Sequence, residues 1–260
     1  MHILRLLWNL IEMYLAYRKN VRVRETGKGA AQLGDAMMKS FMKGDYQKAF
    51  FQAMDPFFKG YLMLQMGQTG AALPLAQFVV SNTKEPQPGA LANNVLGQIY
   101  LEDKKYDQAL ECFRTSKILW QQRGGADRLI AELWLRRGQN TAEALESARR
   151  GIEKERAWEH PTADIRNSNL CEHLGTLAWA VAAESRGAAE VERLVSEGEG
   201  LTGELPVNSV AQMHLHFGNA YAALGRTTES DEHYEKAASL DPNGLAGRAA
   251  KAALAQPVRP

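Results

Sequence analysis

The sequence predicts an all-helical solenoid, a stack of helix hairpins that runs from about residue 29 to residue 256. Two observations lead to this fold class: one pattern of packing residues recurs along the chain, and its turns fall at a regular interval. A third observation is that no segment carries the alternating pattern of a β-strand. With 260 residues and 45% apolar content, the chain can bury a sizeable core.

The recurring pattern is clearest in two stretches, each built around a glycine. The first stretch has a glycine followed by four packing residues: Gly97, then Tyr100, Ala109, Phe113 and Ser116. The second stretch repeats the same offsets of +3, +12, +16 and +19 after Gly218. Packing residues at helical spacing on both sides of a break predict a helix hairpin. The glycine lets the two helices approach closely, and Ala109 or Ser230 is predicted to be its small partner on the second helix.

This pattern resembles the tetratricopeptide repeat, a helix-turn-helix unit of about 34 residues. The turn at Lys104 predicts further turns 34 residues away on either side, near Gly70 and Gly138. The resemblance implies a right-handed superhelix of hairpins that ends in a capping helix. The approximate repeats are 30–55 (truncated), 56–89, 90–123, 124–157, 168–201 and 211–244, followed by the cap at 245–256.

In tetratricopeptide repeats the concave groove is lined by the first helix of each hairpin, at −6, −3, +1, +4 and +5 from the small residue. Carried over to four of the copies, the resemblance implies a peptide-binding groove. Its candidate residues are Phe57, Tyr61, Leu64, Asn94, Gln98, Glu102, Arg128, Glu132, Arg136, Gln212 and Asn219. The groove is therefore expected to be apolar and aromatic towards the N-terminus, and polar or charged in the middle. Asn and Gln there can bond both the N–H and the C=O of an extended peptide. The alternative is that Asn94 and Gln98 are ordinary exposed helix residues.

Sequence motifs for chemistry are not found. No glycine-rich phosphate loop or nucleophile motif is present, so no catalytic residue is predicted and the chain is expected to be non-enzymatic. His214 and His216 are two residues apart, on different faces of a helix, and no metal site or cofactor is predicted. A balance of 31 basic to 30 acidic residues gives no case for nucleic acid. Two distant cysteines, Cys112 and Cys171, fit a reducing compartment such as the cytoplasm.

Residues 1–28 are predicted to form an amphipathic helix followed by a basic linker. A narrow polar stripe runs along an otherwise apolar segment that is too short to span a bilayer. Its aromatic and basic side chains suit an anionic membrane surface or a partner protein: Trp8, Tyr14, Arg18, Lys19, Arg22 and Arg24. The alternative is that this helix packs on the first hairpin or on a second copy of itself.

These features predict a non-enzymatic adaptor that presents its groove to an unidentified protein or peptide, in the cytoplasm or peripherally on the inner membrane. The adaptor role follows from the resemblance and from fold-level analogy. The alternative is a self-assembling structural scaffold whose arm or ends associate. The loose style of the repeats favours a bacterial source.

Overall fold

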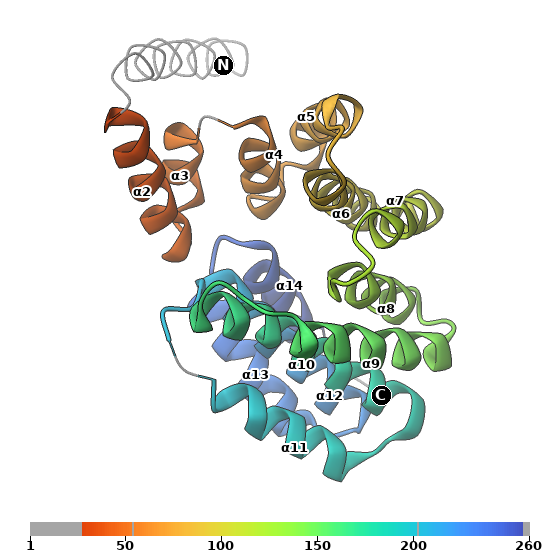
Figure 1. Cartoon of the computed structure of the whole chain (residues 1–260). Helices are drawn as coiled ribbons and strands as arrows, with labels where there is room; N and C mark the ends of the chain where they lie inside the picture. Colours follow the sequence, from red (N-terminus) through yellow and green to blue (C-terminus); the bar gives the residue numbers. More distant parts are fainter. Residues whose placement is uncertain (1–27, 54, 202, 257–260) are drawn as a thin grey trace.

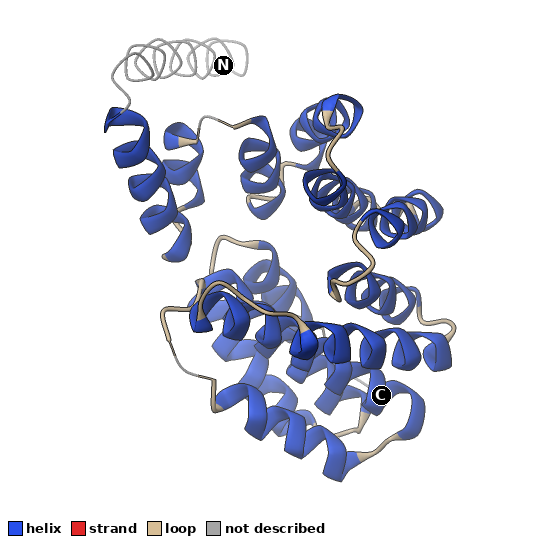
Figure 2. Cartoon of the chain, in the orientation of Figure 1, coloured by secondary structure: helices blue, strands red, loops and turns tan. Residues whose placement is uncertain are grey.

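The computed structural model describes residues 28–53, 55–201 and 203–256, and over these residues it contains thirteen helices and no strand (Figure 2). The predicted all-helical class is confirmed for this part of the chain. The arm residues, from Trp8 to Arg24, lie outside the described residues, so the amphipathic helix stays a prediction. Of the described helices, none combines the length and the apolar character needed to cross a bilayer.

The helices form six hairpins followed by a single helix (Figure 1). The hairpins are α2 (Lys28–Met42) with α3 (Tyr46–Gln52), α4 (Pro56–Gln65) with α5 (Thr69–Asn82), α6 (Pro86–Glu102) with α7 (Tyr106–Leu119), α8 (Gly125–Arg137) with α9 (Thr141–Ala157), α10 (Ala163–Ser185) with α11 (Ala188–Glu199), and α12 (Val207–Ala223) with α13 (Thr227–Leu240). The last helix, α14 (Leu245–Leu254), packs on α13 and α12. Figure 1 shows the successive hairpins following an arc.

Each hairpin turn contains a residue with left-handed backbone. These residues are Gly44, Gly67, Lys104, Gly138, Arg186 and Gly225. Glycine is favoured here because it has no Cβ, whereas a side chain such as that of Lys104 costs roughly 1–2 kcal/mol in this conformation. The turn predicted at Gly138 is confirmed. The turn predicted near Gly70 lies at Gly67 instead, and Gly70 belongs to the first turn of α5.

The conserved offsets of the pattern place an aromatic ring over each packing glycine. A Cβ on Gly97 would lie 2.4 Å from Cε1 of Phe113, and one on Gly218 would lie 2.7 Å from the Tyr234 ring. The aromatic residue at +16 therefore covers the glycine, which corrects the expectation that the small residue at +12 is its close partner. Ser230, at +12, instead donates a hydrogen bond from its hydroxyl to the Gly218 carbonyl at 2.9 Å.

The fifth hairpin departs from this arrangement. Its first helix, α10, has 23 residues and packs against α12. The glycine of this copy, Gly175, faces α12 rather than α11, since a Cβ there would lie 3.0 Å from Cα of Met213. The later hairpins consequently turn back towards the beginning of the stack, as Figure 1 shows for α12 and α14 beneath α2 to α4.

Two hydrogen bonds hold this return. Asn208, in the first turn of α12, donates to the hydroxyl of Tyr61 on α4 at 3.1 Å. Arg248 on α14 donates to the Gln65 carbonyl at the end of α4 at 3.0 Å. The two bonds join the fourth and the last helices to the second hairpin, so the solenoid closes on itself instead of remaining an open spiral.

Candidate functional site

Five charged side chains form a continuous series of ion pairs on the inner side of the solenoid. They are Glu102 on α6, Arg136, Glu132 and Arg128 on α8, and Glu172 on α10. Arg136 lies 2.6 Å from Glu102 and 2.7 Å from Glu132, and Arg128 lies 3.1 Å from Glu132 and 2.9 Å from Glu172. The i,i+4 spacing of the three α8 residues puts them on one face of the helix. Opposite charges alternate along the whole series.

Glu132 occupies the centre of this network and is only 2% exposed. Burial by itself would raise the pKa of its carboxyl group, but Arg136, His216 and Arg128 outweigh burial and hold the pKa well below the usual range. The amide of Gln212 on α12 also donates to this carboxylate, at 3.3 Å. The middle of the predicted groove is thus covered by α12 of the same chain.

A cleft of about 260 Å³ lies beside the ion-pair network. One wall comes from α2, α4 and α6 and is mostly aromatic and aliphatic: Phe41, Phe57, Phe58, Tyr61, Leu91, Asn94, Val95 and Gln98. The facing wall comes from α8, α9, α10 and the residues before α8, and is mostly polar: Arg123, Gly125, Arg128, Leu129, Glu155, Asn169, Glu172 and His173. The cleft therefore offers two chemically different surfaces to one ligand.

A buried acid stands at the back of the polar wall. Glu155 is fully buried and lies 3.0 Å from Arg123 and 3.2 Å from His160. Burial, together with the nearby charges of Arg128 and Arg123, lowers the pKa of His173 well below its ordinary value. His173 is therefore neutral near pH 7, and its ring can donate one hydrogen bond and accept another.

Two polar atoms at the cleft have hydrogen-bonding capacity that the described residues do not use. Oδ1 of Asn94 and Nδ1 of His173 are both enclosed, and neither finds a hydrogen-bond partner within the described part of the chain. Buried polar groups are almost always paired, because leaving one unpaired costs about 1–3 kcal/mol. A ligand that supplies partners here would remove that cost, after a rotation of the Asn94 amide.

The structure distributes the predicted groove residues among three environments. Phe57, Tyr61, Asn94, Gln98 and Arg128 line the cleft. Glu102, Glu132, Arg136 and Gln212 lie next to it, within the ion-pair network. The remaining two are engaged elsewhere: Leu64 is fully buried in a hydrophobic cluster, and Asn219 accepts a hydrogen bond from the Tyr234 hydroxyl at 2.7 Å.

Sequence reasoning missed the residues of the polar wall. Asn169 and Glu172 stand at −6 and −3 from Gly175, so the offsets used for the other copies would have found them. Arg123 and Glu155 carry no such signal, since one precedes α8 and the other lies near the end of α9, a second helix.

Comparison with known proteins identifies the repeats. Residues 90–116 and 211–243 match the family model described as tetratricopeptide repeat. No curated protein matches the sequence. Among solved structures, the chain is similar to the nearly identical TPR-like repeats of a protein assigned as a kinesin light chain from Podosopora anserina, at 20% identity and a TM-score of 0.45, covering 78% of this chain and 96% of that one. It is also similar to YrrB, titled as a TPR protein with an unusual peptide-binding site, at 16% identity and a TM-score of 0.40, covering 84% and 98%.

Proposed function

We propose that this chain, which is a tetratricopeptide-repeat protein, binds an extended segment of a partner protein in the cleft between α4, α6, α8 and α10. Helical-repeat solenoids act in general as protein-interaction scaffolds and present their concave surfaces to partners. The proposal is more specific because the closure by α12 covers much of the concave side and leaves this cleft as the place where groove residues of successive hairpins meet.

The observation that carries the proposal is the pairing of an aromatic wall with a polar wall that contains two unpaired polar atoms. The aromatic wall suits an apolar side chain of the partner, and Asn94 and His173 suit the N–H and C=O groups beside it. Pockets for drug-sized ligands measure about 300–1,000 Å³. A cleft of about 260 Å³ therefore has room for one or two anchoring side chains rather than for a folded domain.

Charge is not expected to dominate recognition. Arg123 pairs with Glu155 and Arg128 pairs with Glu172, so the polar wall is close to neutral. Attraction between distant charges is screened over about 8 Å at physiological ionic strength. The affinity for a partner segment should therefore depend only weakly on salt.

The proposal is tested by selecting binding peptides and then removing the amides of the cleft. A library of displayed random peptides is selected on the immobilised full chain, and the affinities of the selected peptides are measured by fluorescence anisotropy. The double substitution Asn94→Ala with Gln98→Ala should weaken binding by roughly tenfold or more, because each lost hydrogen bond contributes about 0.5–1.5 kcal/mol.

A matched control keeps the number of substitutions on a neighbouring helix. Glu111→Ala with Arg114→Ala changes two exposed residues of α7 that do not line the cleft, and should leave the affinity within about twofold. Circular dichroism of both variants establishes that each is folded. Peptides that bind the amide variant as tightly as the control, or a selection that yields no binder, would contradict the proposal.

The self-assembling scaffold receives no specific support from the described residues. Their exposed large apolar side chains lie on six different helices: Met38, Phe78, Leu91, Ile118, Ile165 and Leu240. Apolar side chains exposed singly in this way are normal on monomeric proteins. Concentration-dependent growth in analytical ultracentrifugation, lost on deleting residues 1–28, would favour the scaffold instead.

A further inference from the structure

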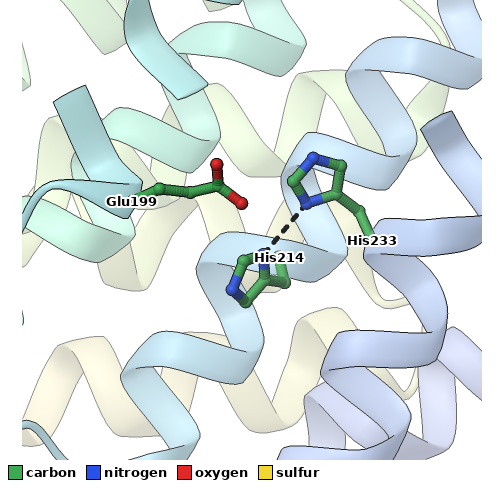
Figure 3. A group of neighbouring side chains, drawn as sticks. All are labelled: Glu199, His214 and His233. Carbon is green, nitrogen blue, oxygen red and sulfur yellow. Dashed lines mark hydrogen bonds between the residues drawn. The ribbon is translucent and has the colours of Figure 1, made fainter. Parts of the chain in front are cut away.

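Three potential metal ligands meet on the C-terminal side of the stack. Glu199 ends α11, His214 lies on α12 and His233 on α13, and Figure 3 shows the three side chains directed towards one another. One ligand atom from each lies within 4.8 Å of the other two. We propose that Glu199, His214 and His233 bind a divalent transition-metal ion of the zinc class.

The two imidazoles already stand close to a ligating geometry. Their Nδ1 atoms are 2.9 Å apart, the contact drawn as a dashed line in Figure 3. Only one proton fits between two nitrogens at this distance, so at least one Nδ1 presents its lone pair inwards. Tetrahedral zinc with Zn–N bonds of about 2.0–2.1 Å separates two ligand nitrogens by about 3.3 Å. A zinc ion could therefore replace the shared proton if the rings separated by about 0.4 Å.

The rings are held in place by packing. His214 is 7% exposed and His233 is 5% exposed. The ring of His233 stacks on Tyr221, with centroids 5.4 Å apart and an angle of 18° between planes, and meets Phe217 edge-on at 5.5 Å. His214 meets Phe217 edge-on at 6.2 Å. Ligands fixed in this way lose little freedom when an ion binds, which favours affinity.

The third ligand opens the site to solvent. Glu199 is exposed, so water can reach an ion there and complete a tetrahedron of three protein ligands and one water. Two imidazoles and one carboxylate suit zinc and its transition-metal neighbours. Magnesium and calcium prefer oxygen ligands throughout and are not expected to bind.

Lys236 sets the charge at this site. Its ammonium group donates to Oε1 of Glu199 at 2.8 Å. A positive charge beside the carboxylate opposes a divalent cation, and Lys236 must move aside or leave one carboxylate oxygen to the metal. The arrangement therefore predicts that removing the ammonium group strengthens metal binding, a result that loss of packing alone would not produce.

The site was not apparent from the sequence because its histidines lie 19 residues apart on separate helices. The neighbouring His216 belongs to another environment, 3.8 Å from Glu132. The pairing of His214 with His233 depends on how α12 and α13 face each other within one hairpin.

The test uses the full chain, purified without a histidine tag and treated with a chelator. Isothermal titration with zinc chloride should give one ion per chain, and magnesium chloride should give no binding. Cobalt(II), added in place of zinc, should produce the intense visible absorption bands of tetrahedral coordination. Glu199→Gln should weaken zinc binding at least tenfold, His233→Gln should abolish it together with the cobalt bands, and Lys236→Gln should strengthen it.

Glu197→Gln is the matched control, because Glu197 lies on the same helix but pairs with Arg156 and Arg193. It should leave zinc affinity within twofold of the wild type. If His233→Gln fails to fold, the exposed position of Glu199 still allows Glu199→Gln to decide. Absence of stoichiometric zinc binding by the wild type, or equal affinity in the wild type and Glu199→Gln, would overturn the proposal.

Discussion

The contact between Gly97 and Phe113 sets a sharp test of how the hairpins pack. The substitution Gly97→Ala adds a single methyl group to the interior of α6. That methyl group would lie 2.4 Å from Cε1 of Phe113, whereas ordinary contacts of a Cβ begin at 3.4 Å. The overlap is therefore about 1 Å, and Phe113 cannot turn away into solvent because it is completely buried.

The expected cost follows from two opposing effects. Overpacking of a core typically costs about 1–3 kcal/mol, and a rigid buried ring places this site near the upper end. Replacing glycine by alanine within a helix returns about 1 kcal/mol through helix propensity. Gly97→Ala should therefore lower the free energy of unfolding by about 2 kcal/mol. Gly70→Ala is the matched control: a Cβ there meets nothing within 4 Å, so this variant should gain up to about 1 kcal/mol.

Urea unfolding followed by circular dichroism measures both variants. The substitution Phe113→Leu removes the ring edge that the new methyl group strikes, and in that background Gly97→Ala should cost at least about 1 kcal/mol less. A Gly97→Ala variant as stable as the wild type would refute the reasoning. An equal cost in both backgrounds would show that the penalty arises elsewhere than at the Phe113 ring.

Three further predictions concern the turn, the ion-pair network and the arm. Lys104→Gly should stabilise the chain by up to about 1 kcal/mol, because it relieves a side chain at φ +59°; no gain in urea unfolding would show that this turn is unstrained. Glu132→Gln should cost about 3 kcal/mol at pH 7, since it unbalances buried charges that each keep one other partner. Folding lowers the pKa of Glu132, so the advantage of the wild type should be complete above pH 4.5 and shrink as the pH falls below it; a difference independent of pH between 7 and 2 would contradict this. The wild type should co-sediment with vesicles that contain phosphatidylserine and a chain lacking residues 1–28 should not; equal behaviour of the two would argue against membrane contact by the arm.

The hairpins could be predicted because the residues that specify them are close in sequence. Gly97 and Phe113 are 16 residues apart, and helical periodicity alone brings them together across a single turn. The same local logic placed the turn at Gly138 correctly. It misplaced the turn near Gly70, because strict counting by 34 ignores a hairpin whose turn comes three residues earlier, at Gly67.

The closure of the solenoid could not be predicted from such patterns. Tyr61 and Asn208 are separated by 147 residues, and their contact depends on the sum of small rotations between all the intervening hairpins. The fate of the predicted groove follows from that closure. Arg128 and Glu132 were expected to face a ligand, but only Arg128 reaches the cleft, while Glu132 is enclosed by ion pairs and by α12.

The contact of Arg248 with the second hairpin bears on the elasticity of the molecule. An open solenoid resembles a spring, since slight rotations between neighbouring repeats accumulate and move its ends far apart. Here the Arg248 guanidinium bonds the Gln65 carbonyl and covers the turn so closely that a Cβ on Gly67 would lie 2.6 Å from Nη2. Such a fastening turns the spring into a ring, in which one joint can rotate only if another compensates. The cleft on the inside of that ring is then an aperture of fixed width, which selects a partner by fit rather than by stretching to accommodate it.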